Sequence, residues 1–390
     1  MDAEVRFFHC GNGDTILIRG GDEWALVDAN LTARSGAGER LRKALTDNDV
    51  KRLRFVCVTH FDADHIRGLG RFLREHFGPN GKDRVAWEIE QVVIPLRVSA
   101  LFWETLFCTE EQYKQFLDEM DDATVPFAEL FDVLRDMGKR DHRIFQSYDP
   151  RTQLVSRNLN PASSPLGPWD VWFLGPSVEI EGRYTLGFAT DWGLGAAPSR
   201  EWPRLLRAAV ERNETSRIVA LYHRLTGDTV LLTGDATCAS IREALLQWEN
   251  VKQQAKLDPR LTFRLVKASH HGAWTDRESD NCHHEELYTR HSSHEHSHVA
   301  ISCRDLDDHH PHPNMINCIR DEVLRSVSTG VPTMATTQGA IRRRGGGMPI
   351  GKIRQSATAL DVLFRFNKDG CMAEGGHLRT GAGHPDQVRS

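Results

Sequence analysis

One stretch constrains the fold more than any other, because a buried strand, a polar cluster and a helix follow one another without a break. LRFVCV (53–58) is almost continuously apolar and rich in β-branched residues, which is typical of a strand buried on both faces of a sheet. HIRGLGRFLREHF (65–77) has the spacing of a helix. Four potential metal ligands lie between the strand and the helix or at the first residue of the helix: His60, Asp62, Asp64 and His65. The chain therefore turns from strand to helix at a cluster of ligands.

The order of residues in this corner suits a metal site. In an extended segment the side chains alternate, so His60 and Asp62 project to one side and Asp64 follows. His65 enters the first turn of the helix, so two histidines and two aspartates can reach one small volume. The simpler alternative is an Asx turn with an aspartate capping the helix and two surface histidines.

Other strand ends carry the same residue types. LVDAN places Asp28 at the end of a strand, VLLTGDAT places Asp235, and LVKASHHGAW places His270 and His271. The carboxyl ends of strands in α/β proteins meet at one edge of the sheet, where their sites lie. A carboxylate between two cations is a natural bridge, and Asp235 is the candidate. Each residue alone has a structural explanation, but together they favour a site for two cations.

The rest of the chain predicts a layered α/β sandwich, since strands and helices mix in two successive halves. Residues 98–165 break this pattern with helical spacing of apolar residues (Phe127, Leu130, Leu134) and end in a Pro/Ser/Asn-rich loop. We expect one domain over residues 1–370, with 98–165 as a mainly helical insertion whose face helps shape a substrate cleft. Residues 371–390, which are rich in glycine, are expected to form a flexible tail.

Charge and cysteine content limit the class of protein. The net charge of −5 gives no global basic field, which argues against a tight duplex-binding protein but not against an enzyme that meets phosphates through metal. Eight scattered cysteines predict reduced thiols. No apolar stretch approaches the ~20 residues of a membrane span. We expect a soluble, cytoplasmic protein with no membrane association.

The spaced motifs resemble a known family. His60-x-Asp62-x-Asp64-His65 is similar to the signature loop of the metallo-β-lactamase superfamily, in the variant where Asp replaces the second His. The chain resembles in particular the C-terminal hydrolase domains of ComEC-type DNA-uptake proteins and their free-standing relatives. The matching segments follow the family's order and leave 98–165 unmatched: VRFFHCGNGDTILIRGGDEWALVDA, VCVTHFDADHIRGL, DVWFLGPS, NETSRIVALYHRLTGDTVLLTGDA, LVKASHHGA, HVAISCRDLDDHHPHPN and TMATTQGAIRRR.

The resemblance implies a four-layer αββα sandwich and a set of site residues. One metal would lie on His60 and Asp62, and the second on Asp64, His65 and preferably His270. Asp235 would bridge the two metals, and Asp28 would orient a ligand histidine. The resemblance also implies that Asp14 lines the site and that Asn213 and His271 contact the substrate. His310 would be a catalytic residue close to the substrate.

Three departures from the family pattern affect this set. The separate middle histidine has no clear counterpart, because His142 lies in the insertion and His223 has the pattern of a strand residue. His9 stands where the first strand of the family usually carries Asp. DLDDHH (305–310) replaces the run that normally precedes the late HP motif, which bears on substrate contacts.

Two further segments have alternative interpretations. The histidine-rich HHEELYTRHSSHEHSH (283–298) lacks regular ligand spacing, so a solvated loop is favoured over metal storage or a lid. The basic run IRRRGGGMPIGKIRQ (341–355) is a candidate for contacting phosphates, and a solvated edge strand with a loop explains it equally well.

These features predict a metal-dependent hydrolase. Two divalent cations, roughly 3.5–4 Å apart, generate hydroxide near neutral pH and suit displacement at phosphorus. Asp62 in place of His favours Mn²⁺, with Zn²⁺ close behind and Mg²⁺ as a further candidate. The first hypothesis is a phosphodiesterase or nuclease acting on DNA or RNA. The alternatives are hydrolysis of a cyclic nucleotide, ester, lactone or thioester, and a non-catalytic, metal-stabilised module that binds a protein partner through 98–165.

Overall fold

The structure is a computed structural model, and it describes twelve segments of the chain. These are residues 3–77, 88–94, 125–140, 166–175, 212–274, 287–288, 298–303, 310–323, 333–336, 361–367, 370–374 and 377–380.

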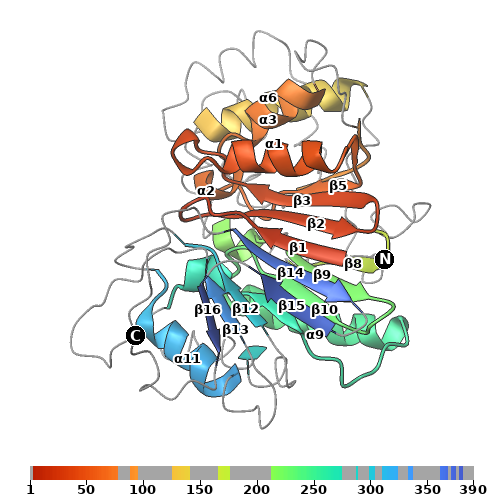
Figure 1. Cartoon of the computed structure of the whole chain (residues 1–390), viewed down its shortest axis with the longest axis vertical. Helices are drawn as coiled ribbons and strands as arrows, with labels where there is room; N and C mark the ends of the chain where they lie inside the picture. Colours follow the sequence, from red (N-terminus) through yellow and green to blue (C-terminus); the bar gives the residue numbers. More distant parts are fainter. Residues whose placement is uncertain are drawn as a thin grey trace, which may run out of the picture.

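Two seven-stranded sheets form the centre of the described structure (Figure 1). The first has the order β15 (Gly370–Glu374), β14 (Val362–Asn367), β1 (Ala3–Phe7), β2 (Thr15–Gly20), β3 (Glu23–Ala29), β5 (Phe55–Cys57) and β7 (Val92–Val93). Its pairs are antiparallel from β15 to β3, and the pairs β3–β5 and β5–β7 are parallel. The parallel part of this sheet carries the signature loop, which follows β5.

The second sheet also combines parallel and antiparallel pairs. Its order is β16 (His377–Thr380), β13 (Thr333–Thr336), β12 (His298–Ile301), β11 (Leu265–Lys267), β10 (Thr229–Leu232), β9 (Ile218–His223) and β8 (Trp169–Leu174). The pairs β10–β11, β11–β12 and β12–β13 are parallel, and the pairs β16–β13, β10–β9 and β9–β8 are antiparallel. A separate short pair joins β4 (Arg52–Leu53) to β6 (Glu88–Ile89).

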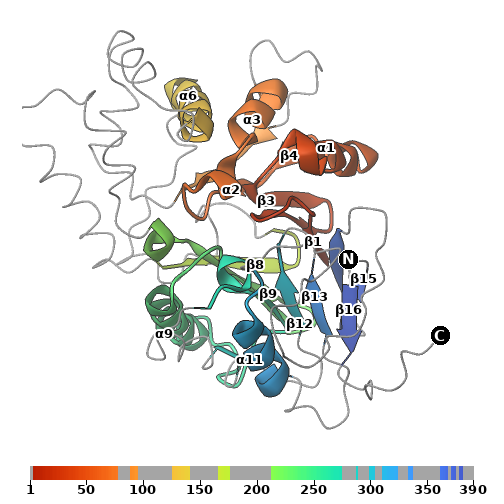
Figure 2. The ribbon, with the colours of Figure 1, turned by 90° about the vertical axis from the view of Figure 1, so that its left-hand side faces the viewer.

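Helices cover the outer face of each sheet, which makes four layers (Figure 2). On the first sheet lie α1 (Ala37–Asp47), α3 (Leu69–Phe77) and α6 (Val125–Arg140), and on the second lie α9 (Cys238–Gln254) and α11 (Pro313–Val323). The loops contain the short helix α2, which has four residues (Ala63–Ile66). They also contain three 3-10 helices: Ala33–Ser35, Arg212–Thr215 and Ser269–Gly272. The predicted α/β sandwich with helical outer layers is confirmed.

The layers follow from the alternation of apolar residues along the strands. On β2, Ile16 and Ile18 face the second sheet, whereas Leu17 faces the outer helices. On β5, Phe55 faces inward and Val56 faces outward, and all five of these side chains are at most 2% exposed. Because successive side chains point to opposite faces, a strand that is apolar at every position needs a covering layer on both sides.

Part of the expected insertion belongs to the outer helical layer. Leu130, Phe131 and Leu134 of α6 are fully buried in the core that α6 shares with α3 and the first sheet. The Phe131 ring also meets the ring of Phe61 in the signature loop at 6.2 Å between centroids. The helix therefore supports the loop from behind. Residues 98–124 and 141–165 lie outside the described residues, so the expectation that the insertion helps shape a substrate cleft stays a prediction.

The segment expected to be a flexible tail is partly strand. β15 pairs with β14 from Asn367↔Gly370 to Leu363↔Glu374, and β16 pairs with β13 from Thr333↔Thr380 to Thr336↔His377. β15 is the edge strand of the first sheet and β16 is the edge strand of the second. Hydrogen bonds to the neighbouring strand therefore give regular structure to a segment whose glycine-rich composition alone predicts a flexible chain. Residues 381–390 lie outside the described residues.

No helix in the described ranges is long and apolar enough to cross a membrane.

Candidate metal centre

The signature loop turns from strand to helix at Asp62, which precedes α2 with an extended backbone (φ −72°, ψ 144°). The Asp62 side chain makes no capping hydrogen bond to the helix. It lies instead beside the His60 ring, with 3.8 Å between Nε2 of His60 and Oδ2 of Asp62. The simpler explanation of Asp62 as a helix cap therefore does not apply.

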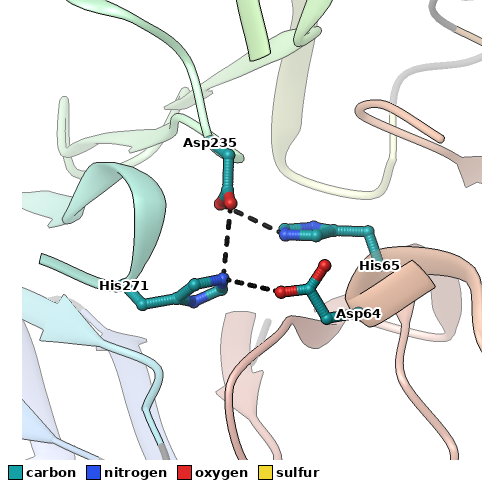
Figure 3. Close-up of side chains that lie close together, drawn as sticks. All are labelled: Asp64, His65, Asp235 and His271. Atoms are coloured by element: carbon teal, nitrogen blue, oxygen red, sulfur yellow. Dashed lines mark ion pairs between the residues drawn. The ribbon is translucent and has the colours of Figure 1, made fainter. Parts of the chain in front are cut away.

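Four ligand-type side chains from both sheets meet in one cluster, which we call the tetrad: Asp64, His65, Asp235 and His271 (Figure 3). One ligand atom from each lies within 4.8 Å of all the others. Asp235 is central, with Oδ1 at 3.1 Å from Nε2 of His65 and Oδ2 at 3.4 Å from Nε2 of His271. Oδ2 of Asp64 lies 3.3 Å from the same nitrogen of His271. The tetrad has the number and type of donors for one divalent cation.

The tetrad is open to solvent on one side. The side chains of His65, Asp235 and His271 are at most 3% exposed, whereas that of Asp64 is 36% exposed. Solvent therefore reaches the tetrad at Asp64, while the other three donors lie in the interior.

Two glycines allow the loops to come this close. At Gly13 (φ +121°) a Cβ atom would lie 2.0 Å from the carbonyl oxygen of Asp64, and at Gly234 (φ +54°) it would lie 2.8 Å from Oγ1 of Thr59. Both positions also have backbone angles that L side chains rarely adopt. A side chain at either position would push apart the loops that carry the tetrad.

Hydrogen bonds orient the histidines of the signature loop. Asp28 accepts from the backbone N–H of Thr59 (2.7 Å), from the Thr59 hydroxyl (2.6 Å) and from Nδ1–H of His65 (2.7 Å). Because the Thr59 hydroxyl donates to Asp28, its oxygen is free to accept from Nδ1–H of His60 at 3.1 Å. Each ring therefore carries its proton on Nδ1 and turns Nε2 toward the site, which is the usual orientation of metal-ligating histidines.

His271 is oriented in the same way, because its Nδ1–H donates to the carbonyl oxygen of Ser302 at 2.9 Å. Nε2 of His60, His65 and His271 is buried, and within the described residues none of these nitrogens has a hydrogen-bond partner of acceptable geometry. An Nε2 lone pair 3.1–3.4 Å from a carboxylate oxygen is repulsive unless a proton or a cation stands between them. These orphaned nitrogens fit a divalent cation at the tetrad.

The aspartates and histidines of the tetrad shift one another's pKa values. Burial lowers the pKa of His271, but Asp235 and Asp64 outweigh it and raise the value to about 9. Burial also lowers the pKa of His65, and Asp235 and Asp28 raise it above its usual value. For Asp235, burial raises the pKa, and the charges of His271 and His65 bring it well below the usual range. The carboxylate is therefore ionised, and protons compete with a cation for the two imidazoles.

A second candidate position lies between His60 and Asp235. Nε2 of His60 is 4.0 Å from Oδ2 of Asp235 and 3.8 Å from Asp62. Burial and the neighbouring His65 lower the pKa of His60 well below its usual value, so its Nε2 is available as a ligand. In the described part of the chain, His60 and Asp62 belong to no compact group of ligand-type side chains, so this position is looser than the tetrad. The ring of His223 meets that of Trp169 in an edge-to-face contact with 4.9 Å between centroids, and His142 lies outside the described residues.

The structure places His271 in the tetrad, whereas the sequence favoured His270. Both residues have left-handed backbones (φ 54° and 45°), so the chain reverses between β11 and the next loop and turns the two rings in different directions. His271 is 2% exposed and His270 44%. Nε2 of His270 lies 3.8 Å from Oδ2 of Asp235, at the rim of the site.

The candidate substrate residues lie around His270. Nδ2 of Asn213 is 3.5 Å from Nδ1 of His270, and the ring of His310 is 5.6 Å from that of His270. Burial lowers the pKa of His270, so its ring is neutral at neutral pH. Asn213, His270 and His310 thus form a polar rim beside the partly exposed Asp64.

Asp14 and Asp28 lie beneath the tetrad, and a residue missed in the sequence lies with them. Oδ2 of Asp14 is 3.8 Å from Nδ1 of His65 and 2.5 Å from Nζ of Lys267. Lys267 ends β11, is fully buried, and also lies 3.5 Å from Oδ1 of Asp235. The available signal was the lysine in FRLVKAS (263–269), which directly follows the apolar pair Leu265 and Val266, since buried lysines need a partner.

The two other segments of uncertain role are mainly outside the described residues. Of the histidine-rich segment 283–298, Leu287 and Tyr288 are buried in the core beneath the second sheet, and His298 begins β12. The basic run 341–355 and the residues 305–309 before His310 lie outside the description. His9, which replaces the family's aspartate, donates its backbone N–H to Asp361 at 2.9 Å.

Comparison with known proteins gives one family match. Residues 10–89, which include the signature loop, match the family model described as the metallo-beta-lactamase superfamily. No curated protein sequence matches the chain. The match supports the superfamily level of the resemblance seen in the sequence, while the ComEC-type resemblance is not supported by it and stays a prediction.

Three solved structures illustrate the similarity. The metallo-beta-lactamase fold protein YhfI from Bacillus subtilis is 12% identical over 85% of this chain and 96% of its own, with a TM-score of 0.39. Unliganded yeast PDE1 is 11% identical over 88% and 99%, with a TM-score of 0.43. A diphosphatase from the PhnP family is 10% identical over 94% and 98%, with a TM-score of 0.33. Similarity at this level carries no argument about the activity of this chain.

Proposed function

We propose, from the metallo-β-lactamase superfamily match of residues 10–89, that this chain is a metal-dependent hydrolase that cleaves phosphodiesters, with DNA or RNA strands as its substrates. The observation that carries the proposal is the tetrad of Asp64, His65, Asp235 and His271, whose two imidazoles turn unbonded Nε2 atoms toward one buried carboxylate. In the metal-free protein, protonated imidazoles would pair with these carboxylates, and a divalent cation would take the place of their Nε2 protons.

The charge of the site favours cation binding. Burial raises the pKa of Asp28, and Asp62 and Asp64 are partly exposed to solvent. Asp14 pairs with the ammonium of Lys267, which leaves the buried Asp235 as the carboxylate whose charge a cation would offset. A buried charge is costly unless it is compensated.

Each cation would be held by its own set of side chains, with one carboxylate shared. Asp64, His65, Asp235 and His271 would hold the first cation, and His60 and Asp62 would hold the second with Asp235 shared. When bound, the cations would lower the pKa of a water molecule and offset the charge of a phosphoryl group. Asp62 in place of a histidine favours Mn²⁺, with Zn²⁺ close behind and Mg²⁺ next.

The rim gives the substrate its orientation in this proposal. The amide of Asn213 can donate to a phosphoryl oxygen, and the neutral ring of His270 can accept or donate beside it. His310 lies within ring-contact distance of His270 and is a candidate proton donor to the leaving oxygen. Substrate would enter on the side of Asp64, the most exposed member of the tetrad.

One experiment tests activity and substrate size together. Protein loaded with Mn²⁺ is incubated with labelled single- and double-stranded DNA and RNA and with bis-(p-nitrophenyl) phosphate. Asp64→Ala is expected to lower kcat/KM by about a hundredfold or more, which corresponds to ~3 kcal/mol of transition-state stabilisation. Asp258→Ala, which removes an exposed carboxylate paired with Arg260, is the matched control and is expected to keep full activity.

The outcomes separate the hypotheses. Equal turnover by the wild type and Asp64→Ala would contradict metal-dependent catalysis. Cleavage of the chromogenic diester without cleavage of any polymer would move the substrate to a small phosphodiester such as a cyclic nucleotide. Cation binding without turnover of any diester or ester would favour the non-catalytic module.

A further inference from the structure

We infer that Lys267 is a positioning residue that holds the carboxylate of Asp235 in the orientation needed to share two cations. This inference rests on the proposed function, because it concerns the cations that the hydrolase would bind. Lys267 would not touch substrate or ligate a cation itself.

The ammonium of Lys267 is fixed from three directions. Nζ lies 2.5 Å from Oδ2 of Asp14, donates to the carbonyl oxygen of Gly234 at 2.7 Å and lies 3.5 Å from Oδ1 of Asp235. The side chain is fully buried, and Asp14 and Asp235 outweigh burial to keep its pKa above the usual value. An ammonium that is held in this way has little freedom to move away from Asp235.

Lys267 differs in kind from the other groups around this carboxylate. Among the described residues, the side chains within ion-pair distance of Asp235 are Lys267 and imidazoles, and each imidazole is a candidate ligand or rim residue: His60, His65, His270 and His271. When cations bind, these imidazoles would contact the cations rather than the carboxylate. The ammonium of Lys267 is the contact that would persist, so it would set the carboxylate's direction in the loaded site.

The position of Lys267 also ties together the loops that carry the site. It ends β11, directly before the loop of His271, and it contacts both Gly234 and Asp235 in the loop after β10. Its partner Asp14 donates its backbone N–H to the carbonyl oxygen of Asp64 at 3.3 Å. One buried ammonium therefore joins the loops of His271 and Asp235 directly and reaches the loop of Asp64 through Asp14.

Charge alone predicts the opposite effect of this residue. A positive charge beside Asp235 repels a divalent cation, so a lysine that acted only through its charge would weaken binding, and its removal would strengthen binding. If Lys267 acts by holding Asp235, its removal weakens binding instead. Loss of a residue that orients a ligand typically costs 10–100-fold in metal affinity, and the sign of the change distinguishes the two roles.

The test is calorimetric titration of metal-free full-length protein with MnCl₂. Lys267→Met is expected to bind Mn²⁺ about tenfold or more weakly than the wild type. The matched control is Lys252→Met, because Lys252 is also buried (4% exposed) but donates to the carbonyl oxygen of Pro259 away from the site. This control is expected to keep the wild-type affinity.

A double variant separates positioning from stability. Lys267→Met leaves Asp14 buried without its ammonium partner and is expected to unfold at a lower temperature. Asp14→Asn/Lys267→Met removes both charges and is expected to recover part of the thermal stability while the Mn²⁺ affinity stays weak. If the single variant does not fold, the double variant supplies the affinity measurement.

Unchanged or tighter Mn²⁺ binding by Lys267→Met, or by the double variant, would overturn the role of Lys267. A wild-type protein that binds no Mn²⁺, Zn²⁺ or Mg²⁺ would instead overturn the proposed function on which the role rests. The two failures are thus distinguished by the wild-type titration alone.

Discussion

The two candidate cation positions differ in how much of the molecule builds them. The tetrad draws Asp64 and His65 from α2, after β5 of the first sheet, and Asp235 and His271 from the loops after β10 and β11 of the second. The other position has His60 and Asp62 from one loop and gains only a share of Asp235. The tetrad thus requires both sheets to be packed together, whereas the second position is largely local.

This difference predicts that the two positions bind a cation with unequal affinity. The first cation would have four protein donors, three of them at most 3% exposed, and the second would have three, with Asp62 26% exposed. More donors that are already fixed bind a cation more tightly, since less ordering is required on binding. We therefore expect the tetrad to fill before the second position.

The largest effect is expected from Asp235→Asn, because this carboxylate belongs to both positions. The amide keeps the shape but loses the charge, so both cations would be lost or weakly held, and kcat/KM would fall about a thousandfold or more, equivalent to ~4 kcal/mol. Steady-state kinetics and metal analysis of the purified variant measure this. Retention of two cations would show that Asp235 does not join the positions.

A comparison of His271→Ala with His270→Ala is expected to show the next largest effect. His271→Ala removes a tetrad donor and is expected to lower kcat/KM about a hundredfold. His270→Ala removes a rim contact and is expected to cost about tenfold or less, mainly in KM. The reverse order, measured in the same assay, would assign the ligand role to the partly exposed ring.

His60→Ala tests whether the two positions are filled separately. Because His60 is 3.8 Å from Asp62 and belongs to the second position, its loss is expected to reduce bound Mn²⁺ from about two to about one per chain while the tighter binding step remains, as for independent sites. Calorimetric titration reports the stoichiometry and both affinities. Loss of both binding steps would mean that the positions form one cooperative unit.

The smallest effect is expected from pH in the metal-free protein. The pKa of His271 is raised from 6.5 to about 9 in the folded state, so its contribution to the free energy of unfolding is fully present below pH 6.5 and is lost as the pH rises through about 9. This loss is expected to be about 1–3 kcal/mol. Denaturant unfolding at pH 6 and pH 9.5 measures it, with His271→Gln as the variant expected to lose much of the difference. A metal-free protein that became more stable over this range would contradict the charge arrangement of the tetrad.

Much of the fold could be predicted because it depends on local spacing. The alternation of Ile16, Leu17 and Ile18 places one side chain toward the outer helices and two toward the second sheet, and that alternation is a property of any extended chain. The edge strands β15 and β16 could not be predicted in the same way. Their order comes from backbone pairing with β14 and β13, which lie elsewhere in the sequence.

The site divides in the same manner. The signature loop, Asp28 and Asp235 were identifiable because each follows an apolar strand, and the structure brings them together at one edge of the two sheets. The choice between His270 and His271 was not accessible, because both follow the same strand and both have left-handed backbones. Lys267 was missed because its importance depends on Asp14, more than 250 positions earlier in the chain.

The sequence by itself determined which strands are buried and which ligand-type residues stand at their ends, since alternation and local turns follow from the covalent chain. Only the tertiary structure decided which histidine faces Asp235, which nitrogen it presents and which lysine neutralises Asp14. The physical reason is that side-chain orientation and charge compensation in a buried site depend on groups from distant loops, and these meet only when the two sheets pack together.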